Sequence, residues 1–174
     1  MLIGLGLAGA SLILRVQDQR QKEQELLFVG QQYIDAIGSY YNSASGISKK
    51  YPQRIADLLQ DTRFLTVKRH LRKPWNDPLT NKEKWGIVYT NLGGIAGFYS
   101  LTQGRPLKQT GFLGELNDKF TGKSSYREWR FVYLPSTGKV EAKDLDIDEN
   151  SSPDQFADSD VDSESQEFVI GIDR

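Results

Sequence analysis

The chain contains no cysteine and a single histidine, His70. The missing cysteines exclude disulfides, thiolate nucleophiles and cysteine-based metal sites. A histidine-rich zinc site is excluded within one chain, because such sites usually take two or three histidines. No serine stands in a Gly-x-Ser-x-Gly elbow, and no nucleophile and base share a recognisable spacing. We therefore expect no enzymatic activity, and we predict that His70 is a surface residue in a basic run.

The sequence also lacks an apolar run long enough to span a bilayer as a helix. "MLIGLGLAGASLIL" fills residues 1–14, ahead of the first charge at Arg15. In a helix this segment reaches only about 21 Å, against about 30 Å for a bilayer core. No positive residue precedes it and no small-residue cleavage site follows it, so it is not typical of a signal peptide. We expect a membrane or assembly stem, carried by Leu2, Ile3, Leu5, Leu7, Leu12, Ile13 and Leu14.

The stem glycines leave two interpretations open. Gly4, Gly6 and Gly9 either let neighbouring stems approach closely, as small residues do in membranes, or sit in a generic apolar anchor. Their spacing is not that of a GxxxG motif.

Charge divides the chain into two parts. Residues 1–143 hold 21 Lys+Arg and 12 Asp+Glu, whereas residues 144–174 hold one Arg and 11 acids. The second part is acidic and has few apolar residues, which predicts a mostly disordered tail that folds back on the basic body or stays solvated. Its last segment, "EFVIGIDR", could add a short edge strand.

Hydrophobic spacing predicts one long helix from near residue 2 to about residue 43, with no proline to interrupt it. Its last third is amphipathic, with apolar residues at steps of three and four. We expect this stripe to pack against a sheet of the same chain. It consists of Leu26, Val29, Tyr33, Ile37 and Tyr40.

The segments that follow are shorter. "YPQRIADLLQD" predicts a second helix with Ile55, Leu58 and Leu59 toward the core. "WGIVYT" and "IAGFYSL", joined by "NLGG", predict a β-hairpin, and "EWRFVYLP" at 128–135 predicts a third strand. The long connection at 102–126 is typical of a functional segment or one held by packing. The fold class is α+β, with a long stem helix on a small antiparallel sheet of three or four strands.

These segments resemble the pseudopilins of type II secretion systems, within the general secretion pathway protein G group, in a divergent branch of the type IV pilin-like proteins. The likeness lies in "ELLFVGQQYIDAIGSYY", "YPQRIADLLQDTRF", "RHLRKPWNDPLTNKEKWG" and "GGIAGFYSLTQGRPLKQTGF", and "YREWRFVY" extends it to about residue 133. The family's stem begins with a phenylalanine-led cleavage motif and has an acid at its fifth mature position. Here Leu5 stands at position 5 and no Gly-Phe-Thr run occurs, so we expect that the first turns of the stem are absent or that the processing site is lost.

The resemblance implies a structural subunit that assembles through its stem into a short periplasmic filament, anchored in the bacterial inner membrane. Its partners would be other pseudopilins or inner-membrane secretion components, in a homo- or hetero-oligomer. The alternative is a membrane-anchored periplasmic binding module that does not enter a filament and uses loop 102–126 as its contact surface. The expected parts are a stem and polar helix segment at 1–22, a pilin-like globular domain at 23–143 and the acidic tail at 144–174.

Two charged segments are candidate binding sites. The basic run could contact lipid headgroups or an acidic neighbour, although such runs are usually solvated, and it is too short and isolated to indicate nucleic-acid binding. Asp144, Asp146 and Asp148 begin like an EF-hand loop, but Glu149 and Gln155 stand where glycine and glutamate are needed. No cofactor is expected, and a weak calcium site of another kind stays open, as in the resembled family. The possible contact patch is Lys68, Arg69, Arg72 and Lys73.

Overall fold

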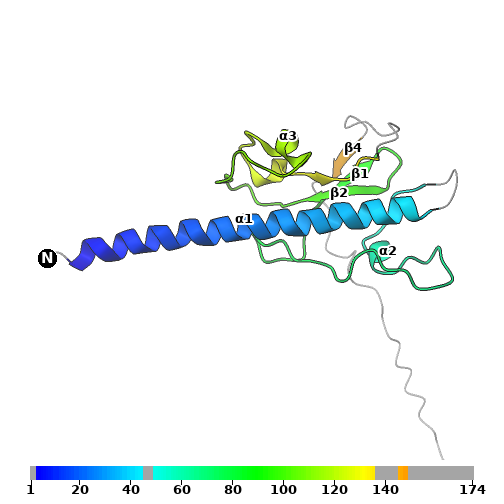
Figure 1. Ribbon diagram of the computed structural model, residues 1–174, viewed down its shortest axis with the longest axis horizontal. Helices are drawn as coiled ribbons and strands as arrows, with labels where there is room; N and C mark the ends of the chain where they lie inside the picture. The colour runs from blue at the N-terminus through cyan, green and yellow to red at the C-terminus, as the bar shows by residue number, and fades with distance from the viewer. Residues whose placement is uncertain (1–2, 45–48, 136–144, 149–174) are drawn as a thin grey trace, which may run out of the picture.

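The computed structural model describes residues 3–44, 49–135 and 145–148, with side chains for 13–44, 49–135 and Leu145. The chain forms a long helix against a small antiparallel sheet, which confirms the α+β class and the long N-terminal helix (Figure 1). The elements are α1 (Ile3–Ser43), α2 (Ala56–Leu59), β1 (Gly86–Thr90), β2 (Ile95–Tyr99), α3 (Leu116–Phe120), the 3₁₀ turn η1 (Tyr126–Glu128), β3 (Phe131–Val132) and β4 (Leu145–Asp148).

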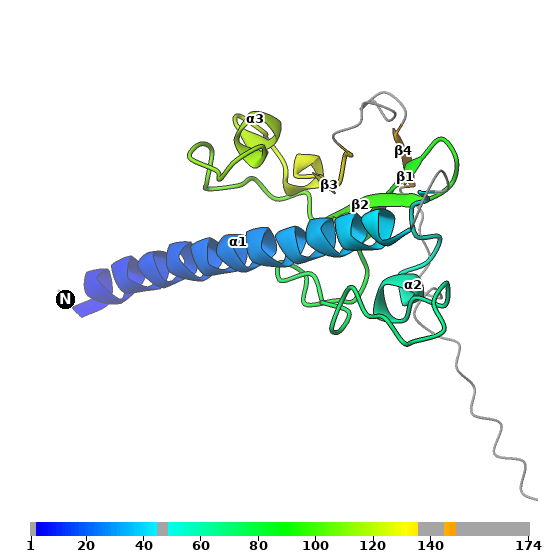
Figure 2. The ribbon, with the colours of Figure 1, turned by 45° about the vertical axis from the view of Figure 1, so that its right-hand side comes forward.

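Helix α1 is 41 residues long and ends where the sequence predicted. Its C-terminal half lies between two layers, with the sheet on one side and α2 with its neighbouring loops on the other (Figures 1 and 2). Its N-terminal part extends beyond both layers. Ile13 and Leu14 are 61% and 65% exposed, so this part of the helix is not covered by the described chain.

The predicted stripe on α1 is buried at all five positions, Leu26, Val29, Tyr33, Ile37 and Tyr40. The ring of Tyr33 lies 4.3 Å from that of Phe98 on β2 and 5.6 Å from that of Trp85. Gly30 faces the ring of Phe131 so closely that a Cβ would overlap it. These contacts join α1 to the sheet, and the absence of a side chain at Gly30 is what permits the approach.

Tyr40 differs from the rest of the stripe. Its ring packs on the Arg63 guanidinium, 3.5 Å away, and on the ring of His70. Both residues follow α2, so Tyr40 contacts the layer opposite the sheet. Residues spaced at three and four share one side of a helix. Because α1 lies between two layers, some residues of this stripe contact the sheet and others contact the opposite layer.

The sheet has the strand order β3-β2-β1-β4, and every pairing is antiparallel. The predicted hairpin is confirmed as β1 and β2, with a bulge between Val88 and Tyr89. In its turn, the Thr90 N–H donates to the Gly94 carbonyl at 2.8 Å, and Gly93 adopts φ +85°. Glycine is needed there because that backbone conformation is strained for other residues.

Two predicted elements are shorter than expected. The second helix is only the four-residue α2, and the third strand is only Phe131–Val132. Glu128, expected at the start of that strand, instead closes a capping box with Ser125 around η1. Such side-chain bonds offer the backbone an alternative to a sheet ladder, which is why the strand begins later.

The acidic segment begins with a strand. β4 pairs along β1, with Leu145 opposite Thr90 and Asp148 opposite Ile87. A boundary at residue 143 therefore separates β4 from the sheet to which it belongs. The Leu-Asp-Ile-Asp alternation has the period of a strand, and its high charge concealed that signal. The expectations for the acidic tail beyond Asp148 and for "EFVIGIDR" lie outside the described residues.

Candidate functional site

The stem residues lie on the part of α1 that extends from the body (Figure 1). Leu2 falls outside the described residues, while Ile3, Leu5, Leu7, Leu12, Ile13 and Leu14 are all helical. Within the described ranges, no helix has the length and apolar character needed to cross a membrane.

A second group of α1 residues holds the long connection at 102–126. The carboxylate of Glu23 is buried, at 2% exposure, and accepts bonds from the backbone N–H groups of Leu107 at 2.5 Å and Lys108 at 3.2 Å. The hydroxyl of Tyr126 donates to the same carboxylate at 2.7 Å. One turn earlier, the Gln19 amide donates to the Arg105 carbonyl and to the Tyr126 oxygen. We refer to Gln19, Glu23 and Tyr126 as the polar clasp.

The polar clasp changes the interpretation of both the connection and the domain boundary. Burial is the main cause that raises the pKa of Tyr126, the Gln19 bond opposes the shift and Glu23 adds to it, so the hydroxyl stays protonated and donates. The connection is therefore held against α1, and it also contains α3. The folded body extends back to Gln19, whereas the sequence placed its start at residue 23. Sequence reasoning missed the clasp because its members lie 103 and 107 residues apart.

A third group joins α1 to the loop after α2. The side chains of Asp61 and His70 are fully buried, and His70 Nε2 lies 3.1 Å from Asp61 Oδ2. Arg63 donates to both oxygens of Asp61, at 2.8 and 2.7 Å, and to the Tyr40 carbonyl at 2.8 Å. Arg63 is the main reason that the pKa of Asp61 lies well below its ordinary value. The prediction of a surface histidine at position 70 is wrong, because His70 turns inward to this buried carboxylate.

His70 also meets a serine. Ser39 Oγ lies 2.8 Å from His70 Nδ1, which completes a Ser–His–Asp chain of hydrogen bonds. Ser39 lies within α1, where backbone N–H groups are used by the helix and cannot form an oxyanion hole. Arg63 already compensates the charge of Asp61. We therefore infer that the hydrogen bonds among Ser39, His70 and Asp61 hold residues 61–70 against α1.

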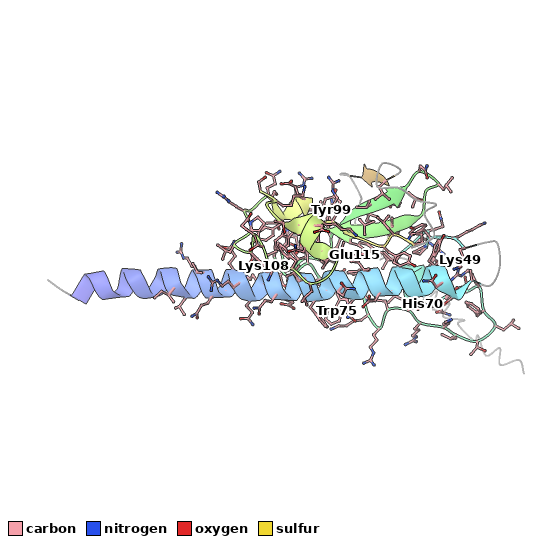
Figure 3. The ribbon with its side chains drawn as sticks, turned by 45° about the horizontal axis from the view of Figure 1, so that its top comes forward. Lys49, His70, Trp75, Tyr99, Lys108 and Glu115 are labelled. Carbon is pink, nitrogen blue, oxygen red and sulfur yellow. The ribbon has the colours of Figure 1, made fainter. Side chains whose placement is uncertain are left out.

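The predicted basic patch is exposed at all four positions, Lys68, Arg69, Arg72 and Lys73. Phe64, Leu65 and Val67, in the same loop, are exposed apolar residues. A bond from the Asp61 N–H to the Lys68 carbonyl, at 2.9 Å, closes the base of this loop. Figure 3 shows His70 and Trp75 on the side of α1 opposite Tyr99 of the sheet.

A groove of about 710 Å³ runs between the middle of α1 and residues 73–81. Its walls carry charges of both signs, including Asp18, Lys22 and Lys73, beside the half-buried Trp75. Across the described ranges, no group of three or more His, Asp or Glu side chains could hold a metal ion. Asp144, the first residue of the EF-hand-like run, lies outside those ranges.

Comparison with protein-family models, with curated proteins and with solved structures finds no match for this chain. The function proposed for this chain therefore depends on the geometry of α1 and the surfaces around it.

Proposed function

We propose that this protein is a structural, non-enzymatic subunit of a type II secretion or type IV pilus-type machine, resembling the pseudopilins. It assembles through α1 into a short filament, with the N-terminal part of α1 in the inner membrane and the globular part in the periplasm. The observation that carries the proposal is the uneven coverage of α1. The helix is 41 residues long, and its apolar N-terminal part extends from a body that packs only on its later turns (Figure 1).

The open side of α1 supplies a surface for assembly. Gln24, Phe28, Gln31 and Asp35 recur at helical spacing and remain exposed between the two layers. Phe28 is 54% exposed although its ring meets the edge of Trp75. This strip lies on the same helix as the stem, so neighbouring subunits could pack side by side along both. The buried stripe is not available for this purpose, because it holds the body together.

The test uses the absence of native cysteine. A single cysteine at Ile13 should crosslink between neighbouring subunits in bacterial cells. Asp35→Lys should lower the crosslink yield at least about tenfold, because an interface charge that meets a like charge opposes association. Thermal melting of the purified Asp35→Lys protein should match that of the parent, since the site is exposed. Asp118→Lys, an exposed charge reversal on α3, is the matched control and should crosslink normally.

Two results would contradict the proposal at different levels. Unchanged crosslinking in Asp35→Lys would exclude this strip as the interface. No crosslinking in the parent would favour the membrane-anchored binding module, whose contact surface includes the exposed Leu113 in the 102–126 connection.

A further inference from the structure

The loop at 62–73 combines exposed apolar residues with positive charge. We refer to these residues as the basic loop. Phe64, Leu65 and Val67 are 37%, 110% and 61% exposed relative to a free residue, and Leu65 is thus entirely open to solvent. Four exposed cations follow them in the same loop, Lys68, Arg69, Arg72 and Lys73. Such a surface suits a partner that is acidic and also carries apolar side chains.

The positive charge of the basic loop is not compensated within the described chain. Residues 62–73 contain five Lys+Arg and no acid, and only Arg63 is paired, with Asp61. Among the described residues, no salt bridge reaches the other four cations. Lys68 and Lys73 instead lie over the rings of Phe64 and Trp75, at 4.9 and 4.4 Å. Their charged groups remain accessible to an acidic segment.

The end of β4 lies near a point where the sheet contacts the layer that contains the basic loop. β4 ends at Asp148, opposite Ile87 of β1. Two residues before Ile87, the indole N–H of Trp85 donates to the Trp75 carbonyl at 2.7 Å. Trp75 in turn lies under the ammonium of Lys73. Because an extended chain covers about 3.3 Å per residue, the 26 residues after Asp148 are long enough to reach the basic loop.

The residues after β4 have the matching chemistry. Residues 149–174 contain eight acids and one Arg, a net charge of −7. Apolar residues are interspersed, namely Phe156, Val161 and the run Phe168–Ile170. We propose that residues 149–174 dock on the basic loop of the same molecule, with carboxylates on its cations and apolar side chains on Phe64, Leu65 and Val67. This contact is independent of filament assembly.

Attachment to the same chain makes a weak contact sufficient. A short covalent connection gives an effective concentration in the millimolar range, so a tail with millimolar affinity would be docked a large part of the time. The contact would cover the basic loop until a stronger acidic partner displaced the tail. It would also be sensitive to salt, because exposed charges separated by more than the Debye length are screened.

Paramagnetic relaxation in the full chain tests the contact directly. A nitroxide on Thr66→Cys, in a zwitterionic detergent, should broaden the amide signals of residues 149–174 several-fold at low salt. A nitroxide on Asn91→Cys, in the β1–β2 turn at the other end of β1, is the position control and should broaden them much less. Raising the salt from about 0.05 M to about 0.5 M shortens the Debye length to about 4 Å and should remove most of the broadening.

Charge reversal identifies the surface. Arg69→Glu with Arg72→Glu should abolish the broadening from Thr66→Cys. The control pair Lys50→Glu with Arg130→Glu should preserve it. The two pairs are matched, because all four residues are exposed and each pair makes the same change in charge. Contacts between copies are detected in a mixture of two proteins. One is isotope-labelled and carries no nitroxide, and the other carries the nitroxide and no isotope label. Broadening only in the mixture would overturn docking within one molecule in favour of a second copy. No broadening at low salt, or broadening unchanged by the Arg69 and Arg72 reversals, would also overturn it.

Discussion

At the scale of single residues, the arrangement around α1 depends on polar groups that are buried and paired. Tyr33 is the clearest case on α1. Its ring packs on Phe98 and Trp85, while its hydroxyl donates to the Trp75 carbonyl at 3.3 Å and accepts from the Trp75 N–H at 3.1 Å. One side chain thereby joins the two layers, and burial raises its pKa to about 12.

Asp61 gives a prediction for stability in acid. Arg63 and His70 face its carboxylate, and its folded-state pKa is depressed. Its stabilising effect is therefore complete above the unfolded pKa of about 4 and is lost as the pH falls through the folded value. Asp61→Asn should lower the free energy of unfolding at pH 7 by about 1.5–3 kcal/mol, since it removes bonds to a charged partner.

Denaturant titrations at several pH values check this expectation. The difference between parent and Asp61→Asn should be constant above about pH 5 and should shrink below about pH 4. Asp35→Asn, on the exposed face of α1, should stay within about 0.5 kcal/mol of the parent. A difference between parent and Asp61→Asn that does not change with pH would show that the charge of Asp61 is not the cause.

At the scale of elements, the polar clasp determines where the 102–126 connection lies. Glu23→Ala leaves the Leu107 and Lys108 N–H groups without their acceptor. Hydrogen bonds to a charged acceptor are worth about 1.5–3 kcal/mol, so the connection should open before the rest of the body. Hydrogen exchange at these two amides should become at least about fivefold faster. Glu25→Ala, an exposed neighbour on α1, should leave both exchange rates unchanged.

The edge strand β4 gives a second prediction about elements. A chain that ends at Lys143 loses β4 and exposes the edge of β1, so its melting temperature should fall by at least about 5 °C. A chain that ends at Asp148 should melt with the full chain in about 0.5 M salt, where attraction between the tail and the basic loop is screened. Equal melting of the Lys143 chain and the full chain would mean that β4 adds no stability.

At the scale of the whole molecule, the stem and the body share one continuous helix, and the packing of the body on that helix begins at the polar clasp. A chain that starts at Gln17 keeps Gln19 and Glu23 and should retain the parent's free energy of unfolding. A chain that starts at Gln24 loses both and should be less stable by about 1–3 kcal/mol. Urea unfolding measures the difference. Tyr126→Phe should cost stability in the chain from Gln17 and little in the chain from Gln24, because its partners are already missing there.

The sequence by itself determined the features that depend on local spacing. The absence of proline and the steps of three and four in "ELLFVGQQYIDAIGSYY" fixed the extent of α1 and its buried stripe, and "NLGG" fixed the hairpin turn. These features follow from the backbone period, so neighbouring residues were enough to find them.

Tertiary structure decided the rest. By local sequence, Glu23 resembles a solvated helix residue and His70 part of a surface charge run, yet both side chains are buried. Tyr126, 103 residues away, bonds to Glu23, and Ser39, 31 residues away, lies beside His70 in addition to the nearby Asp61. β4 joins the sheet because β1 offers a free edge, which the local charge of "DLDIDEN" did not indicate. A charged group is buried only where its partners are already in place, and those partners lie far away in the sequence and become visible only once the chain has folded.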